Sequence, residues 1–374
     1  GGSGGTITIS GGSVTATTMT GRTIGLLAER NQGRWAGAAI GGSFGGSSGN
    51  ITISGGTVTA IVSSQTAPHA DPDADPKYSA GIGSSDHSIG GGTITISGGT
   101  VFAQSPDGAG IGCGENSDGS AIVIAISGGT VEAVSTNGAG IGGGMIEALS
   151  AMVNFEKTYS GGKITISGGS VSAQSTNGAG IGSGAVIYDV EEVSERNTPE
   201  VNGGTITVSG GTVSAQSVRG AGIGGGSGQV TVGSTVTVDP DAQTTPSLTL
   251  SSGSGGTVTI SGGTVEAVST EGVGIGSGGM PFYQSESHNV DQYIYCVSGE
   301  AGTFATGTDG NAVLFATGSG AGNHIQDDDD PSGWSGVIFL DGEGQLYGTS
   351  VTLSEDVTIP SGNTLEIGQG QTLS

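Results

Sequence analysis

Residues 93–99, Thr-Ile-Thr-Ile-Ser-Gly-Gly, contain the pattern that decides the fold. The tetrapeptide Ile-Ser-Gly-Gly, replaced once by Val-Ser-Gly-Gly, recurs along most of the chain. Its copies place their serine at Ser10, Ser54, Ser97, Ser127, Ser167, Ser209 and Ser261. Self-similarity at intervals of this size indicates a repeat protein, in which each repeat is one small structural unit.

Each copy lies between two segments in which apolar and polar residues alternate, such as 93–96 and 130–134. Alternation with a period of two predicts β-strands with one apolar side. The Gly-Gly pair allows a corner at which a Cβ atom would clash. Strands joined by such corners and stacked at about 4.8 Å form a β-solenoid. We therefore predict an all-β fold, a right-handed parallel β-helix of at least seven coils with lateral loop insertions.

Stacked coils would place equivalent apolar residues above one another in the core. The first predicted ladder is Ile9, Ile53, Ile96, Ile126, Ile166, Val208 and Ile260. The second is Val14, Val58, Val101, Val131, Val171, Val213 and Val265, and the third is the alanine two residues further on, from Ala16 to Ala267. Identical shapes at every level pack densely without large rings, in keeping with an aromatic content of only 4%.

A Gly-Ile-Gly tripeptide marks another corner of each coil. Its isoleucines are Ile40, Ile82, Ile111, Ile141, Ile181, Ile223 and Ile275. Insertions precede this corner near 17–37 and 61–79, and follow it near 145–160, 185–202 and 227–254. Residues 145–152 are predicted to form a short amphipathic helix over the coils. Residues 1–374 are predicted to be a single continuous β-helix domain, regular over 1–280 and divergent over 281–374, and a piece of a longer protein.

Composition and charge exclude several classes of protein. The 80 glycines lack the strict spacing of collagen, and no apolar run approaches the roughly 20 residues that cross a bilayer. A net charge of −25 argues against nucleic acid or anionic lipid as a partner. Cys113 and Cys296 lie too many coils apart for a disulfide, so both are predicted to be unpaired packing residues.

The repeats carry a family resemblance. Residues 91–101, Gly-Gly-Thr-Ile-Thr-Ile-Ser-Gly-Gly-Thr-Val, together with Gly-Ala-Gly-Ile-Gly-Gly-Gly at 138–144 and 220–226, resemble the glycine-rich β-helix repeats of large surface proteins from gut-type Firmicutes, which include carbohydrate-binding-domain-like proteins. Segments 334–339, 347–356 and 359–362 are similar to the sequence that often closes such arrays. The resemblance implies a secreted or cell-surface protein of a Gram-positive-type bacterium, and it carries no catalytic motif.

Two patterns with known chemistry have structural explanations. Residues 138–143 satisfy the Gly-x-Gly-x-x-Gly motif of dinucleotide sites, but here the motif recurs as a solenoid corner rather than between a strand and a helix. Asp327, Asp328, Asp329 and Asp330, like the acids at 71–75, offer hard oxygen ligands for a weak calcium site, with a solvated loop as the preferred alternative. No cofactor is expected beyond such an ion.

An enzymatic alternative rests on acids that follow the Gly-Ile-Gly corner. Asp86 and His87 follow it in one copy, and Glu115 and Asp118 follow it in the next. Consecutive coils would bring these residues together, and paired carboxylates in a groove are what glycoside hydrolysis requires. The alternative is therefore a polysaccharide-degrading glycoside hydrolase or lyase. The Ser/Gly-rich turns around these residues favour the simpler interpretation of polar turn residues.

Two further surfaces are candidates for binding. Trp35, Arg34, His69 and Tyr78 lie in the first insertions, where an aromatic ring beside polar groups would suit a glycan. Outward Thr-x-Thr pairs such as Thr93 and Thr95 are similar to those of ice-binding solenoids, although Asn50, Val123, Ala125 and Lys163 interrupt the array.

The sequence favours a non-enzymatic function. We expect a rigid extracellular or cell-surface stalk, matrix, adhesive or fibre element, whose partners are glycans or neighbouring surface proteins. An unpaired terminal coil exposes backbone donors and acceptors, so end-to-end self-association is also expected.

Overall fold

The computed structural model describes residues 2–20, 34–35, 37–66, 76–88, 91–149, 158–190, 199–232, 248–279, 282–283, 294–318, 334–353 and 356–374. Over these ranges the regular structure is β-strand, apart from the 3₁₀ turn η1 (Gly119–Ala121). No helix within the described ranges has the length and apolarity needed to cross a membrane.

The strands on both sides of the Ser-Gly-Gly corner form one sheet of 13 strands. Its members up to the last regular coil are β1 (Thr6–Thr20), β4 (Gly49–Thr66), β7 (Gly92–Ile96), β8 (Thr100–Ser105), β10 (Ile122–Ile126), β11 (Thr130–Ser135), β15 (Lys163–Ser175), β19 (Thr205–Ser217), β23 (Thr257–Ser269), β27 (Thr303–Gly318) and β28 (Gly336–Leu340). All of these pair in parallel, so each strand continues the same sheet one coil further along.

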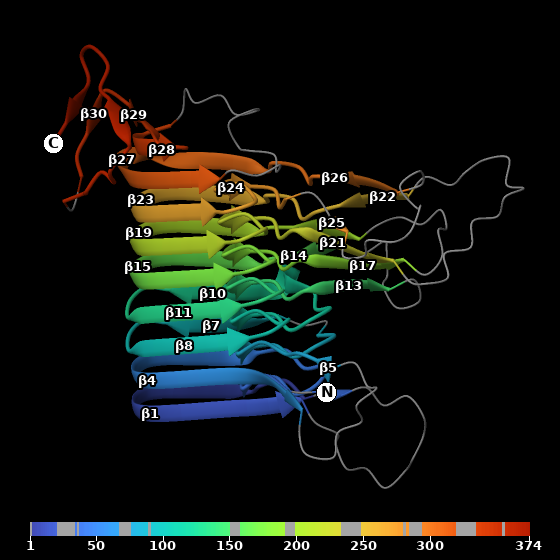
Figure 1. The fold of residues 1–374 in the computed structure, drawn as a ribbon. Helices are drawn as coiled ribbons and strands as arrows, with labels where there is room; N and C mark the ends of the chain where they lie inside the picture. Colours follow the sequence, from blue (N-terminus) through green and yellow to red (C-terminus); the bar gives the residue numbers. More distant parts are fainter. Residues whose placement is uncertain are drawn as a thin grey trace, which may run out of the picture.

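The Gly-Ile-Gly corners form a second parallel sheet of seven short strands. These are β3 (Ile40–Gly41), β6 (Ile82–Gly83), β9 (Ile111–Gly112), β12 (Ile141–Gly142), β16 (Ile181–Gly182), β20 (Ile223–Gly224) and β24 (Ile275–Gly276). In Figure 1 the chain rises from the N-terminus, crosses the front from left to right and returns behind, which is a right-handed coil. The predicted parallel β-helix is confirmed.

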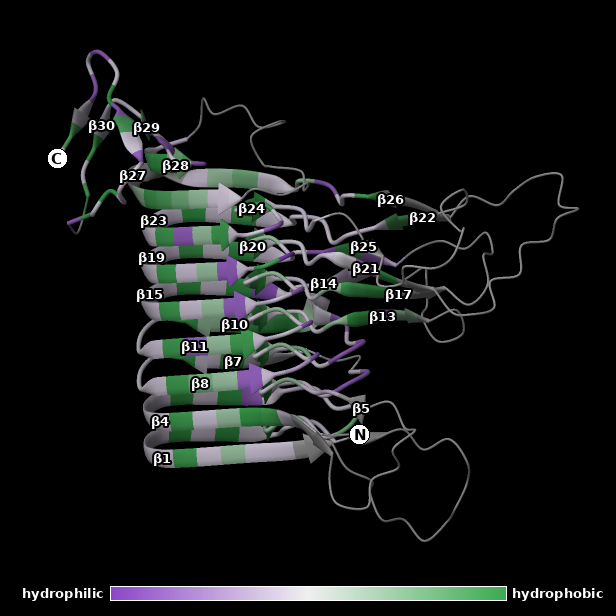
Figure 2. Ribbon diagram, viewed as in Figure 1, coloured by the Kyte–Doolittle hydropathy of each residue, from purple (hydrophilic) through white to green (hydrophobic). Residues whose placement is uncertain are grey.

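The three predicted ladders are confirmed residue by residue. Ile9 pairs with Ile53, Ile53 with Ile96, and the register then continues to Ile260 without a break. The valine and alanine ladders keep the same register. From the second coil onward these side chains are buried in one continuous core. Figure 2 shows the resulting alternation of hydrophobic and hydrophilic residues along the front strands.

Glycine is required where successive corners approach each other most closely. Gly182 has a φ of 140°, and a Cβ atom at this position would overlap the carbonyl oxygen of Gly224 in the next coil. Gly142 meets Gly182 in the same way one coil earlier. A side chain at these positions would therefore push the coils apart.

The insertions that follow Gly-Ile-Gly contain strands of their own. Outgoing strands β13 (Ile146–Leu149), β17 (Val186–Val190), β21 (Gly228–Val232) and β25 (Phe282–Tyr283) form a four-stranded parallel sheet. Returning strands pair as β14 (Thr158–Ser160) with β18 (Glu200–Asn202), and as β22 (Leu248–Ser251) with β26 (Ile294–Val297). These strands lie together on one side of the stack (Figure 1). In the earlier insertions β2 (Arg34–Trp35) pairs with β5 (Pro76–Lys77).

The predicted helix at 145–152 is wrong, because residues 146–149 form strand β13. Ile146 and Ala148 are buried and pair with Val186 and Tyr188 of β17, respectively. Glu147 and Leu149 favour a helix locally. The neighbouring insertion offers β17 as a partner strand, and pairing with it outweighs that preference.

The last coils differ from the regular ones. β28 pairs in parallel with β27, but β29 (Glu343–Tyr347) then runs antiparallel to β28. The short strands β30 (Ser350–Val351), β31 (Thr364–Glu366) and β32 (Thr372–Leu373) follow. A second small core contains Val313, Val337, Phe339, Leu346 and Val351, outside the main core. The C-terminal hairpin therefore packs against the outer face of β27, and the predicted division into regular coils over 1–280 and divergent coils over 281–374 stays a prediction.

Candidate functional site

The four acid and histidine candidates lie in two stacked turns that follow β6 and β9. The His87 amide donates to the Glu115 carbonyl at 3.0 Å, so the turn containing Asp86 stacks on the one containing Glu115. His87 and Asn116 both have φ values of 53°, the left-handed conformation that closes each turn. Asp86 is 0% exposed and Glu115 is 1% exposed. The structure thus brings two carboxylates into neighbouring positions, inside the protein rather than in an open groove.

Glu115 is bound to the backbone of the preceding coil. Its Oε2 accepts the backbone N–H of Tyr78 at 3.1 Å, and its own N–H donates to the Tyr78 carbonyl at 2.9 Å. Its Oε1 accepts a hydrogen bond from Asn116 Nδ2 at 3.1 Å. Both carboxylate oxygens therefore satisfy donors of the fold, which is a structural use of a buried acid.

Asp86 and His87 form a carboxylate–imidazole contact in the turn after β6. Asp86 Oδ1 lies 2.7 Å from His87 Nδ1, while Asp86 Oδ2 is buried without a hydrogen-bond partner. The His87 side chain is 44% exposed, and its ring centroid is 6.5 Å from that of Phe44. A carboxylate beside one ring nitrogen fixes the orientation of the imidazole. Chemically, this imidazole would serve as a base.

Asp118 has a local role. Its Oδ1 accepts the Ser120 N–H at 2.9 Å, so it caps the 3₁₀ turn η1. Its charge also contributes to the raised pKa of Cys113 and of Tyr159, for both of which burial is the larger cause. Its carboxylate is thereby engaged within its own turn.

Cys113 is a buried free thiol beside this region. Burial raises its pKa to about 12, against a smaller lowering by a hydrogen bond with Ser84. A thiol with such a pKa is almost fully protonated near neutral pH and therefore a poor nucleophile. The unpaired state predicted for Cys113 is confirmed, while the Cys296 side chain lies outside the described residues.

The predicted glycan and calcium residues lie mostly outside the described residues. His69 and Asp327–Asp330 are not among them, and Arg34 and Trp35 are described only as backbone in β2. Tyr78 is 6% exposed, so its ring is packed inside rather than offered to solvent. In the described ranges no group of three or more His, Cys, Asp or Glu side chains is placed to hold a metal ion. Both sites remain predictions.

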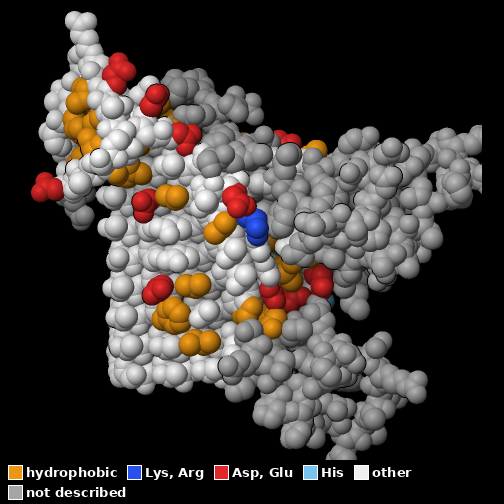
Figure 3. Space-filling model, viewed as in Figure 1, with side chains coloured by type: hydrophobic (Ala, Val, Ile, Leu, Met, Phe, Trp, Pro, Cys, Tyr) orange, Lys and Arg blue, Asp and Glu red, His pale blue; other side chains and the backbone are white. Residues whose placement is uncertain are grey.

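The outward threonines lie in two aligned ranks. Thr205 pairs with Thr257 and Thr257 with Thr303, and Thr207 pairs with Thr259 in the adjoining rank. The interruptions lie in register with them, because Val123 pairs with Thr93 and with Lys163. Figure 3 shows the front of the stack, where β8 and β11 lie, rather than the threonine ranks, and charged side chains over the described strands of this face are few and scattered. Ice binding by the threonine ranks remains a prediction.

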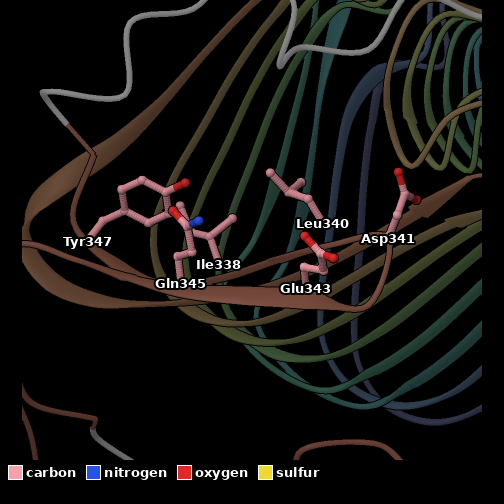
Figure 4. A pocket seen from close by; sticks show the side chains of 6 residues that line it. All are labelled: Ile338, Leu340, Asp341, Glu343, Gln345 and Tyr347. Carbon is pink, nitrogen blue, oxygen red and sulfur yellow. The ribbon is translucent and has the colours of Figure 1, made fainter. Parts of the chain in front are cut away.

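The sequence did not reveal a cavity at the C-terminal end of the stack. Its volume is about 300 Å³, and the described residues that line it are Ile338, Leu340, Asp341, Glu343, Gln345 and Tyr347 (Figure 4). A signal was present in the sequence, because Glu343, Gln345 and Tyr347 alternate with Gly344 and Leu346 along one strand. The alternation was not recognised because the strand runs antiparallel and falls outside the repeat.

Comparison with protein families supports the fold. Six segments match the model described as a beta helix repeat, and they are 51–86, 94–115, 124–145, 164–185, 201–227 and 258–279. Each segment contains one Ser-Gly-Gly corner and the next Gly-Ile-Gly corner. Comparison with curated proteins and comparison with solved structures each gave no match.

Proposed function

We propose that this parallel β-helix repeat protein is a non-enzymatic structural scaffold, exported to the cell surface or the surrounding matrix. The observation that carries the proposal is the unbroken register of its core, which runs from Ile9 to Ile260 through every intervening coil. An unbroken ladder couples each coil to its neighbours by hydrogen bonds and by packing, and so gives a stiff unit.

The chemistry of the buried acids supports a scaffold. Glu115 accepts a backbone N–H from the preceding coil, and Asp118 caps a turn. An acid that is committed to main-chain donors is not free to protonate a leaving group or activate water. In this proposal Glu115 holds two successive coils together and Asp118 holds its own turn, and stiffness is their contribution to function.

The edges of the stack suggest how a scaffold would be extended. Among the described strands, β1 pairs only with β4, and Ile7, Val14 and Ala16 are only partly buried against the core. At the other end, the antiparallel strand β29 interrupts the parallel order. We propose that neighbouring surface proteins or further copies of the chain are the partners of this scaffold.

A polysaccharide-degrading enzyme is the second candidate. The observation in its favour is the contact between Asp86 and the half-exposed His87 at 2.7 Å, next to the buried carboxylate of Glu115. Substrate access argues against it, because Asp86 and Glu115 are both fully buried. Release of product from a glycan panel would favour this candidate.

Labelling of intact cells tests the proposed location. An antibody raised against the outward residues of β19 and β23 should bind to intact cells that produce the full protein, or to their extracellular matrix, and treatment with an external protease should remove the signal. Signal that appears only after lysis would refute an exported scaffold.

A further inference from the structure

The cavity at the C-terminal end lies on the hairpin of β28 and β29. Ile338 pairs with Gln345 and Leu340 pairs with Glu343 across this hairpin. Directly opposed residues of an antiparallel pair share a face, so these side chains point to the same side. Figure 4 shows them lining one hollow, with Tyr347 at one end and Asp341 at the other.

The hollow combines an apolar floor with a fixed aromatic wall. Ile338 is 1% exposed and belongs to the main core. The ring centroid of Tyr347 lies 5.2 Å from that of Trp334, whose ring in turn packs edge-on against Phe304 at 4.9 Å. A ring held by such neighbours loses little freedom when a ligand stacks on it.

The polar groups of the hollow are available to a ligand. Neither the Glu343 carboxylate nor the Gln345 amide forms a side-chain hydrogen bond with any described residue, and Asp341 uses only Oδ1, which accepts the Gly318 N–H at 3.0 Å. Elsewhere in the stack, inward positions are filled by apolar side chains of the next coil. Here the coil ends, and acceptor groups face an open volume instead.

Charge selects among the ligands that fit. The described lining contains two carboxylates and no basic residue, and the whole chain carries a net charge of −25. Anionic ligands such as uronic acids are therefore repelled, and a cation is attracted. A cation that also presents a flat face of C–H groups would use both the carboxylates and the tyrosine ring.

We propose that this cavity binds an amino sugar that carries a free ammonium group. The ammonium group pairs with Glu343 and Asp341, the sugar ring stacks on Tyr347, and a hydroxyl group bonds to Gln345. The cavity volume of about 300 Å³ is at the lower end of the usual range of about 300–1,000 Å³ for small-molecule sites, which suits one sugar ring at the end of a chain. This inference deepens the proposed surface scaffold by assigning it a ligand.

Calorimetric titration of the full chain with a glucosamine disaccharide tests the proposal, at about 0.15 M salt to screen non-specific attraction. We expect saturable binding that Glu343→Gln weakens by about tenfold or more, which corresponds to about 1.4 kcal/mol. Glu132→Gln is the matched control, because Glu132 is an exposed glutamate on the outer face of β11, away from the cavity. That variant should bind like the unaltered protein.

The comparison ligands are the N-acetylated disaccharide and a galacturonate disaccharide, and both should bind at least about tenfold more weakly. The proposal is overturned if the glucosamine disaccharide does not bind, if Glu343→Gln binds it as well as the unaltered protein, or if the N-acetylated form binds equally. The scaffold proposal is tested by surface labelling and not by these titrations. A negative titration would therefore overturn the ligand proposal alone.

Discussion

Gly182 occupies one of the positions where neighbouring coils approach most closely. Its backbone φ of 140° is unfavourable for any residue with a side chain, and the space beside it is filled by the backbone of Gly224. Gly182→Ala should therefore lower the stability of the stack by about 1–3 kcal/mol from backbone strain alone, with a further loss from overlap. The midpoint of denaturant unfolding measures this effect.

Gly11→Ala is the control for that substitution. Gly11 belongs to a Ser-Gly-Gly corner, but a Cβ atom there would meet no other atom within 4 Å. We expect its unfolding midpoint to match that of the unaltered protein. Equal loss of stability in both variants would show that close approach at Gly-Ile-Gly is not what requires glycine.

Cys113 makes the stability of the fold sensitive to alkaline pH. Burial raises the pKa of its thiol from 9.0 to about 12, so the unfolded chain loses this proton at lower pH than the folded chain. The stabilisation is complete below pH 9 and is lost as pH rises through 12, by up to about 4 kcal/mol. Thermal unfolding between pH 8 and pH 12 should show a steeper decline for the unaltered protein than for Cys113→Ala. Parallel curves would contradict this assignment.

Among the elements, the C-terminal hairpin should unfold separately from the regular coils. Phe339 is 1% exposed, and its ring stacks on Phe315 with centroids 4.6 Å apart. Phe339→Ala should cost about 3–5 kcal/mol within this small core. Because coils contact only their neighbours, we expect faster amide hydrogen exchange across 336–351 and unchanged exchange in β11 and β15.

Phe102→Ala is the matched control for Phe339→Ala. Phe102 lies on the outer face of β8 and is only partly buried, so its replacement should leave exchange in the hairpin unchanged. Faster exchange throughout the stack in Phe339→Ala would show that the hairpin and the coils unfold as one unit.

Strand elements that repeat could be predicted in register, and those that do not repeat could not. The ladders from Ile9, Val14 and Ala16 followed directly from the spacing of Ser-Gly-Gly, because identical coils can stack only one way. β13 was missed because its partner, β17, lies in an insertion with a different sequence. The two turns that contain Asp86 and Glu115 were predicted, but the burial of these acids was not, since it depends on the direction in which each side chain points.

The hairpin of β28 and β29, which lines the candidate cavity, could not be predicted from the sequence either, because it does not repeat. Residues 337–340, Val-Ile-Phe-Leu, are apolar without alternation, because Ile338 faces the main core while Val337 and Phe339 face the second one. Such a run does not reveal which side is inward. The direction of β29, and with it the cavity, therefore required the structure.

The whole molecule is a stack of coils with lateral strands on one side and a C-terminal hairpin at one end (Figure 1). The same types of residue fill the core of every regular coil, and the sequence varies in the insertions and at the two ends of the stack. This distribution suits a scaffold, in which regular coils provide stiffness and the irregular parts provide contacts. On this account the acids at the turns after β6 and β9 contribute to stability and not to turnover.

Assay of the full chain against neutral, amino and acidic polysaccharides, with Glu115→Gln and Glu132→Gln in parallel, tests this central claim most directly. Reducing ends and unsaturated products would be quantified alongside the melting temperature. The account predicts no product from the unaltered protein. It also predicts a lower melting temperature for Glu115→Gln alone, because an amide has one acceptor oxygen for the two donors, Tyr78 N–H and Asn116 Nδ2, that now bond the carboxylate. Product from the unaltered protein would contradict the account, and loss of that product in Glu115→Gln at an unchanged melting temperature would assign the turnover to this acid.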